Sequence, residues 1–450
     1  MSETIPLQID PVTLTLTGTV TIPSANGGGD SPTQRGYDAV KDLGLDNTGA
    51  NDCAAALQQW IDANGNNTEL HFPPGRYRFN TMVETNAKNA KLIGDSIASR
   101  RGDGAVLFFT DQALDALLWW NCNQEASNLE GPTIENIQFQ DLSSTHDQLR
   151  CAIRITNVAN TEIRVSFLNM IPRRYTTGTV SVQQGSKMVT GHGTNWTMDM
   201  VPAWMVIAGY PYEVLQVHSP TSLSIALGYI GSSKHGQAYA INWRGIGVWC
   251  DPGLDFTQYG TNWALSGRIA CALFCSAGTG STGISRIKVR SGYLNGTGIA
   301  DSIAAYMGPY SDTNEWHVAM NSYAYGVVVA NGHQHQLLDA DYENAGGPPP
   351  VTGKPVDYGS CYGILVMSDN ASDSWGNRLG GYFRQVGTAM ELYGQPGKAP
   401  SHTVIGVSTF RSNKTNFVIG NATDTSGFIP LSTFSLSWAW LCRLWRRIFG

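Results

Sequence analysis

Three acidic residues recur at every second position in one short stretch of the chain, at Asp339, Asp341 and Glu343. Alternate residues of a β-strand share a face and lie about 6.6 Å apart. Cleavage of a glycosidic bond needs two carboxyl groups beside it, about 5 Å apart for retention of configuration and about 6.5 to 9.5 Å apart for inversion. Crowding would raise the pKa of one carboxyl, which could then donate a proton while a neighbour stays ionised as base. The spacing therefore fits acid–base catalysis on a sugar bond.

This arrangement requires that Leu338, Ala340 and Tyr342 point into the core. If the strand extends further toward the N-terminus, His333 and His335 join the same outer face as candidate substrate-binding residues. Two other interpretations of the cluster stay open. Acidic residues near turns often cap backbone groups, and His-x-His with Asp-x-Asp-x-Glu also offers ligands for a cation. We expect neither a resident metal nor another cofactor.

A second pair with the same spacing, Glu315 and His317, lies in the segment TNEWHVAM. Glu315 is a further candidate catalytic carboxyl, and His317 a candidate substrate-binding residue. Arg384 would project outward from a later strand, where it could neutralise a uronate carboxylate if the reaction were a β-elimination. Elimination also requires a base such as Lys, Tyr or His. We favour glycoside hydrolysis over elimination.

The elements that must position these residues begin with a short helix. Apolar residues recur at helical spacing at Cys53, Leu57, Trp60 and Ile61. Asn51 and Asp52 precede them as candidate caps.

Two strands joined by a tight turn follow the helix. Leu70 and Phe72 alternate with polar neighbours, and the segment 73–75, Pro-Pro-Gly, forces a turn. Tyr77 and Phe79 then resume the alternation.

This order of helix, strand, FPPGRY turn and strand closely resembles the opening of pectate-lyase-like right-handed β-helix proteins. In that superfamily a helix caps the first coil and an FPPGxY segment begins the solenoid. The resemblance implies an architecture that is mostly used to hold or cut polysaccharide. No calcium-binding triplet typical of pectate lyases can be recognised, which puts pectate lyase activity itself in doubt.

Short alternating stretches bounded by Asn, Asp or Gly recur over 81–175, and again from 244 onward. Their recurrence at roughly 20 to 30 residues predicts on the order of ten to twelve coils stacked about 4.8 Å apart. We therefore expect an all-β fold, a right-handed parallel β-helix with an N-terminal capping helix, an inserted small all-β module and a short C-terminal amphipathic helix. The expected parts are an arm over 1–34, a capped start of the β-helix over 35–175, the module over 176–243, the rest of the β-helix over 244–430 and the C-terminal helix over 431–450.

The segment 176–243 reads as antiparallel hairpins with Gly or Ser turns. It resembles a small all-β module of phage tail proteins and bacterial surface proteins. Trp196 or Trp204 could bind sugar there, although we favour a structural spacer.

Both ends of the chain have patterns of their own. Residues 13–22 alternate and 27–29 are three glycines, which predicts an arm that attaches the body to other virion proteins, or else an untethered tail. Near the C-terminus, apolar residues fall at spacings of four and three at Phe434, Trp438, Leu441, Trp445 and Ile448. We favour an association helix of a homotrimer over binding of a membrane surface through this helix.

Composition narrows the function further. Charged residues make up 14% and the net charge is −6, so a nucleic-acid partner has no support. The eight cysteines lack a disulfide spacing, which predicts buried free thiols. No secretory signal is visible, which fits synthesis in a host cytoplasm and export as part of a virion.

Together, these features and the resemblance imply a bacteriophage tailspike or tail-fibre protein. Such a protein would be a homotrimer of the virion tail that binds and depolymerises a bacterial surface polysaccharide. Two alternatives stay open: a non-enzymatic adhesin or structural virion component, and a bacterial polysaccharide-degrading enzyme.

Overall fold

The computed structural model of the chain describes residues 3–8, 17–22, 35–95, 104–111, 113–122, 130–252, 263–277, 284–296, 299–343, 361–369, 374–396, 398, 400, 403–411, 415–420 and 429–430. Met1–Arg35 and Gly36–Gly450 are two compact units. In the first unit, β1 (Glu3–Gln8) pairs antiparallel with β2 (Thr17–Ile22). The expected extended arm is thus a short hairpin where it is described, and the three glycines at 27–29 lie outside the described residues.

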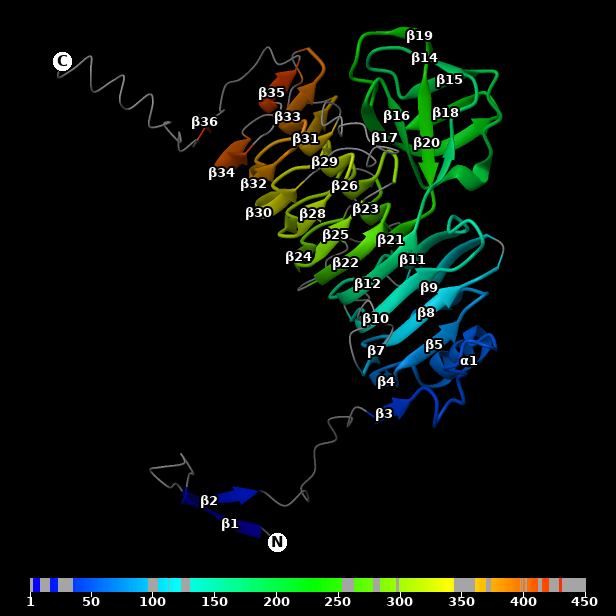
Figure 1. Cartoon of the computed structure of the whole chain (residues 1–450), viewed down its shortest axis with the longest axis vertical. Coiled ribbons are helices and arrows are strands. Elements are labelled where there is room, and N and C mark those ends of the chain that lie inside the picture. Colours follow the sequence, from blue (N-terminus) through cyan, green and yellow to red (C-terminus); the bar gives the residue numbers. More distant parts are fainter. Residues whose placement is uncertain are drawn as a thin grey trace, which may run out of the picture. The chain divides into compact units, whose positions relative to one another are not determined.

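The second unit is a right-handed parallel β-helix, as expected, built on two long parallel sheets (Figure 1). One has sixteen strands: β3 (Arg35–Asp38), β4 (Thr68–Phe72), β7 (Lys91–Gly94), β10 (Thr133–Asp141), β12 (Glu162–Met170), β22 (Trp263–Ile269), β24 (Lys288–Ser291), β27 (Glu315–Trp316), β30 (Gln336–Glu343), β32 (Arg378–Arg384), β34 (Val404–Arg411) and β36 (Ile429–Pro430), with β5 (Gly75–Arg78), β8 (Ala105–Phe109), β25 (Tyr293–Asn295) and β28 (Ala319–Asn321) beside that path.

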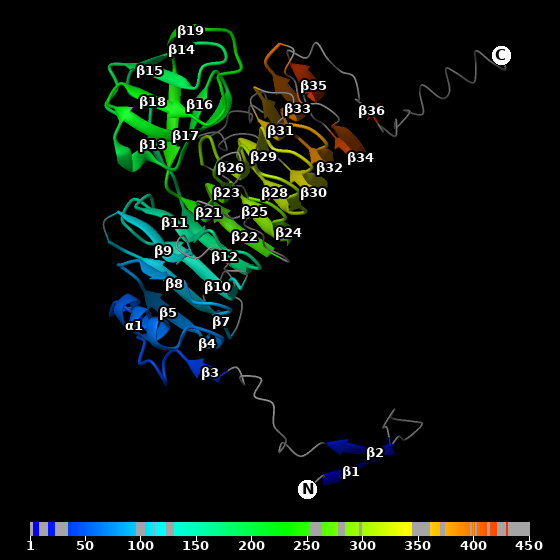
Figure 2. The same ribbon diagram turned by 180° about the vertical axis from the view of Figure 1, so that it is seen from behind.

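The other sheet has ten strands: β6 (Val83–Thr85), β9 (Leu114–Asn121), β11 (Leu149–Thr156), β21 (Ile246–Asp251), β23 (Cys271–Cys275), β26 (Ile303–Met307), β29 (Tyr325–Ala330), β31 (Tyr362–Ser368), β33 (Thr388–Gly394) and β35 (Thr415–Gly420). Figure 2 shows the same stack from behind. Nine spacings of about 4.8 Å give a stack about 43 Å long. Ten stacked strands agree with the predicted number of coils.

The capped start has the predicted elements. Helix α1 (Ala54–Asn64) buries Leu57, Trp60 and Ile61, and the Asp52 carboxylate accepts a hydrogen bond from the Ala54 N–H at 3.1 Å. The alternating residues of the next two strands are fully buried, namely Leu70, Phe72, Tyr77 and Phe79. At Gly75 a Cβ would lie 2.6 Å from the Asn47 carbonyl oxygen, which explains why the turn needs glycine.

Inside the solenoid, apolar side chains of successive coils form one continuous core. Three buried polar residues stack beside it, Asn314, His335 and Asn377. The Asn314 N–H donates to His335 Nδ1 at 3.1 Å, and the His335 N–H donates to the Asn377 side chain at 3.1 Å. These hydrogen bonds satisfy backbone groups at the bends between the two sheets.

The predicted antiparallel module is an eight-stranded sheet: β13 (Arg173–Tyr175), β14 (Thr179–Val182), β15 (Met188–His192), β16 (Ala203–Ile207), β17 (Tyr210–Ser219), β18 (Ser222–Ile225), β19 (Lys234–Gln237) and β20 (Tyr239–Trp243), with a 3₁₀ turn η1 (Met198–Met200). Trp196 and Trp204 are 1% and 0% exposed, so the suggestion that either binds sugar is wrong. Both indoles belong to a buried apolar cluster that the module shares with the ten-stranded sheet.

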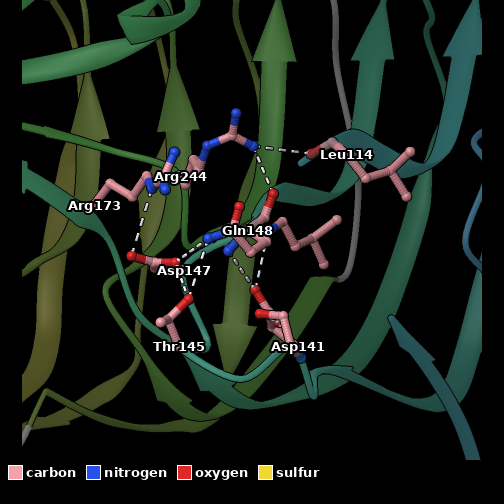
Figure 3. Close-up of polar contacts among 9 residues, drawn as sticks. Leu114, Asp141, Thr145, Asp147, Gln148, Arg173 and Arg244 are labelled. Carbon is pink, nitrogen blue, oxygen red and sulfur yellow. Dashed lines mark hydrogen bonds and ion pairs between the residues drawn. The ribbon is translucent and has the colours of Figure 1, made fainter. Parts of the chain in front are cut away.

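The module enters and leaves the solenoid at one place. Arg173 of β13 pairs with Trp243 of β20, and β21 then resumes the coil with Cys151 opposite Ile246. Figure 3 shows how the junction is held: the buried Arg244 donates to the carbonyls of Gln148 (2.5 Å) and Leu114 (3.5 Å). The inserted chain therefore leaves the stacking of the coils intact.

The seven described cysteines are buried free thiols, as predicted, and Cys442 lies outside the described residues. The expected C-terminal helix over 431–450 lies outside them as well. In the part of the chain that the structure describes, no helix has the length and apolarity to cross a bilayer.

Candidate functional site

The strand that carries the acidic cluster is irregular. Leu337 and Tyr342 are both fully buried although they are five residues apart, and Leu338 is partly exposed. The pairing of β30 with β32 shifts register between Leu337 and Ala340. A bulge thus reverses the alternation in mid-strand, so the expectation that Leu338 points into the core is wrong. Asp339 lies in this bulge, and its side chain is outside the described residues.

After the bulge, Asp341 and Glu343 lie on the outer face, on either side of the buried Tyr342. In the neighbouring strands, Asp341 pairs with Ala319 of β28 and Tyr382 of β32. Ala319 in turn pairs with Tyr293 of β25. Two tyrosines, Tyr293 and Tyr382, therefore flank the pair formed by Ala319 and Asp341. The short side chain of Ala319 leaves room on the surface between them.

Glu343 begins a second row of side chains beside the first. It pairs with Asn321 on one side and Arg384 on the other, and the Arg384 guanidinium forms an ion pair with its carboxylate. Asn321 donates from Nδ2 to the Tyr293 hydroxyl at 3.2 Å, which links the two rows. Tyr293 is 46% exposed, an unusually open position for a ring. Exposed rings beside amides and carboxylates suit a sugar, which has apolar faces and hydroxyl groups.

Asp341 has the electrostatics of a proton donor. Burial raises the pKa of its carboxyl, the nearby charge of Glu343 raises the pKa further, and Arg384 partly offsets both. Its Oδ1 atom is inaccessible to solvent and has no hydrogen-bond partner among the described residues. A carboxyl of this kind keeps its proton to higher pH than a free aspartate.

Glu315 lies apart from this pair. It is opposite Gln336, at the start of β30, five residues before Asp341. Burial raises the pKa of Glu315, but the hydrogen bond and charge of Lys288, with Arg290 and His317, outweigh burial and lower the pKa. The Lys288 ammonium lies 2.8 Å from the carboxylate. The register thus does not bring Glu315 beside Asp341, and Glu315 forms a charged cluster with its own cationic partners.

The two histidines upstream of β30 have different environments. His335 is 0% exposed, so its assignment to the outer face as a substrate-binding residue is wrong. Burial, with a further contribution from the charge of His333, lowers the pKa of its imidazole to about 3. His333 remains partly exposed at the bend before β30, where it stacks on Trp375.

Sequence reasoning missed Tyr293, Asn321 and Tyr382. Each lies on an outward position of a short strand, a signal that the alternation in the sequence could have supplied. Their position beside Asp341 depends on the register between coils, which the alternation does not contain.

The described residues contain no group of three or more His, Cys, Asp and Glu that could hold a metal ion. The side chains beside Asp341 and Glu343 on the neighbouring strands are those of tyrosine, asparagine and arginine.

Comparison with known proteins bears on the first part of the chain. Residues 38–202 match the family model described as rhamnogalacturonase A/epimerase, pectate lyase-like. The match confirms the predicted resemblance to the pectate-lyase-like superfamily, and its range contains the FPPGRY turn. No curated protein matches the sequence. The coils that carry Asp341 and Glu343 lie beyond the matched residues.

Solved structures with some likeness include ORF18 of Geobacillus virus E2, at 11% identity and a TM-score of 0.38. The alignment covers 88% of this chain and 62% of the viral one, so the chain spans less than two thirds of that protein. The A-module of the mannuronan C-5 epimerase AlgE4 of Azotobacter vinelandii has 10% identity and a TM-score of 0.32, with coverage of 88% and 99%. The tailspike protein gp49 of Pseudomonas phage LKA1 has 10% identity and a TM-score of 0.23, with coverage of 84% and 63%.

Proposed function

We propose that this protein binds a bacterial surface polysaccharide and hydrolyses one of its glycosidic bonds on the outer face of the sixteen-stranded sheet. One observation carries the proposal. Asp341, whose pKa is raised, and Glu343, which is paired with Arg384, leave the same strand about 6.6 Å apart between exposed sugar-compatible side chains. Carboxyl groups held at that spacing would lie at the lower limit for enzymes that invert configuration.

In the proposed reaction, Asp341 donates its proton to the glycosidic oxygen as the bond from that oxygen to the anomeric carbon breaks. Glu343 accepts a proton from a water molecule, whose oxygen forms the new bond to the anomeric carbon from the opposite face. Arg384 holds Glu343 in place, and Tyr293 and Tyr382 hold the sugar rings on either side of Asp341. Proton exchange with solvent restores both carboxyls.

Three of the other predicted residues keep roles outside this pair. His317 and Glu315, with Lys288 and Arg290, form a charged patch near the start of the strands. There they would contact an acidic substituent of the glycan. Asp339, two residues before Asp341, remains a candidate second acid.

We extend the proposal to a homotrimer in a virion tail, attached through the N-terminal segment. The support is the apolar spacing in 434–448 and the strand-forming segments before residue 35. Binding without cleavage is the second candidate, and the ion pair of Glu343 with Arg384 favours it, because a base engaged by arginine is a weaker proton acceptor.

A screen tests the proposal. Purified protein is incubated with panels of capsular polysaccharide and lipopolysaccharide, and released oligosaccharides are followed through their reducing ends and the absorbance of unsaturated uronate. We expect new reducing ends without that absorbance, and NMR of the fresh product should show the inverted anomer. Absorbance of an unsaturated uronate would indicate elimination, and glycan binding without release would indicate an adhesin.

A further inference from the structure

An exposed aromatic ring lies away from the proposed catalytic pair, at the opposite end of the same strands. Trp375 is 39% exposed and precedes β32 by three residues. Its ring stacks on His333, with centroids 5.9 Å apart and ring planes 15° from parallel. His333 precedes β30 by the same three residues. The two rings therefore lie at the bend that leads into neighbouring strands of the proposed site.

A third coil adds a carboxylate to this pair of rings. Asp312 forms an isolated parallel bridge with His333, and its Oδ2 atom lies 3.9 Å from His333 Nε2. Asp312 Oδ1 and His333 Nδ1 are inaccessible to solvent and have no hydrogen-bond partner among the described residues. The bend thus combines an open indole with a partly exposed imidazole and a partly exposed carboxylate.

The residues that the structure describes on either side of Trp375 in the chain are not apolar. The flanking Ser374 and Gly376 offer no apolar surface, and Gln334 donates its backbone N–H to the Trp375 carbonyl at 2.9 Å. A protein interface of useful strength places its aromatic anchors inside a desolvated apolar patch. A single ring among hydrogen-bonding groups instead suits a pyranose, whose apolar face stacks on the ring while its hydroxyls bind the rim.

From the position of these residues, we infer that Trp375, His333 and Asp312 form a second, non-catalytic sugar-binding subsite. The inference rests on the proposed function, because the ligand is a remote part of the same polysaccharide. Eight residues separate His333 from Asp341, which corresponds to at most about 26 Å in extended chain. A glycan that runs parallel to the strands would cross the charged patch around Glu315 and reach both places.

The charge at the subsite also indicates which sugar it takes. Asp312 repels a uronate or another acidic substituent, whereas Arg384 is paired with Glu343. Lys288 and Arg290 bind Glu315, whose position opposite Gln336 lies between His333 and Asp341. The subsite therefore binds a neutral pyranose, and acidic units of a mixed polymer are placed toward Asp341. Its contribution is to hold a long chain while the bond near Asp341 is cleaved.

The test compares the variant Trp375→Ala with Trp375→Tyr, which keeps a ring, and with Leu215→Ala. Leu215 is 41% exposed on the module and serves as the matched control for loss of an exposed apolar side chain. Affinity for the polysaccharide retained from the panel is measured by affinity electrophoresis, together with turnover of its short oligosaccharide products and the oligomeric state by light scattering.

We expect Trp375→Ala to weaken binding of the long polymer about five- to thirty-fold and to leave turnover of short oligosaccharides unchanged. Trp375→Tyr should restore most of the binding, and Leu215→Ala should match the wild type. Unchanged affinity in Trp375→Ala would overturn the inference while leaving the proposed function intact. So would dissociation of the oligomer in that variant, which would mark the ring as a subunit contact. If wild-type protein retains no polysaccharide of the panel, the proposed function and this inference fail together.

Discussion

Arg384 of β32 and Glu343 of β30 occupy paired positions on neighbouring coils, and their side chains form an ion pair. The same guanidinium lowers the pKa of Asp341, whereas burial and the charge of Glu343 raise it. One arginine therefore acts on both proposed catalytic carboxyls.

Replacing Arg384 by glutamine should shift the pH dependence of cleavage. Without the guanidinium, the pKa of Asp341 rises and the acid stays protonated to higher pH. The alkaline limb of the pH–rate profile therefore shifts to higher pH. Arg378→Gln, an exposed arginine at the other end of β32, is the control. If the alkaline limb of Arg384→Gln stayed at the same pH or shifted to lower pH, the result would contradict the role of Asp341 as the acid.

The variants Asp341→Asn and Glu343→Gln should each lower the cleavage rate about 10²- to 10⁴-fold, because each removes one partner of the proton transfer. Polysaccharide binding should persist, since Tyr293 and Tyr382 remain. Rates are measured from reducing ends and binding by affinity electrophoresis. Glu135→Gln is the control, because Glu135 also lies on the sixteen-stranded sheet and faces an arginine, Arg164, at 3.6 Å. Full activity in either site variant would remove that residue from the mechanism.

A buried carboxyl of the module should make stability depend on pH. Glu213 of β17 accepts hydrogen bonds from the Ala277 N–H at 2.9 and 3.1 Å, and burial raises its pKa to about 8. Between pH 4.5 and 8 the folded protein holds a proton that the unfolded chain has lost. The free energy of unfolding therefore falls as pH rises through this window, by up to about 1.4 kcal/mol per pH unit, and levels off above pH 8.

The variant Glu213→Gln should flatten that slope, as measured by melting temperatures from pH 5 to 9. Glu84→Gln, at an exposed carboxylate, should keep the wild-type slope. If Glu213→Gln kept the wild-type slope as well, the pH dependence would come from other groups.

The turn of the FPPGRY segment should tolerate no side chain at Gly75. A Cβ there would meet the Asn47 carbonyl oxygen at 2.6 Å, so Gly75→Ala must displace backbone and should cost about 1 to 3 kcal/mol. At Gly36 a Cβ would meet only a side-chain atom of His71 at 4.0 Å, so Gly36→Ala is the matched control. Chemical denaturation of both variants gives the comparison, and equal stabilities would show that the turn relaxes without cost.

Local pattern predicted the elements of the capped start, and the family resemblance that these elements carry predicted the β-helix. The helical spacing around Trp60, the alternation around Phe72 and the Pro-Pro-Gly turn are each set by neighbours within a few residues. Each of them was confirmed, because the pleat and the helical repeat dictate which side chains point inward.

The site could be predicted only in part, because it depends on two things that alternation does not contain. One is the bulge between Leu337 and Ala340, which exchanges the faces of the strand and explains why His335 is buried while Asp341 faces outward. The other is the register between coils, which depends on bends of unequal length. That register places Glu315 beside Gln336 and brings Tyr293 and Tyr382 to either side of Asp341.

The inserted module is tied to coils far from the one through which it enters. Trp204 donates to the carbonyl of Asp301, the Gly228 N–H donates to Asp369, and the Tyr210 hydroxyl donates to Glu391. In a solenoid each repeat otherwise depends on its immediate neighbours, so the free end can fray one rung at a time. Contacts between the module and several coils should make these coils unfold together. A force applied to the C-terminal end would therefore have to unfold all the coils that the module contacts.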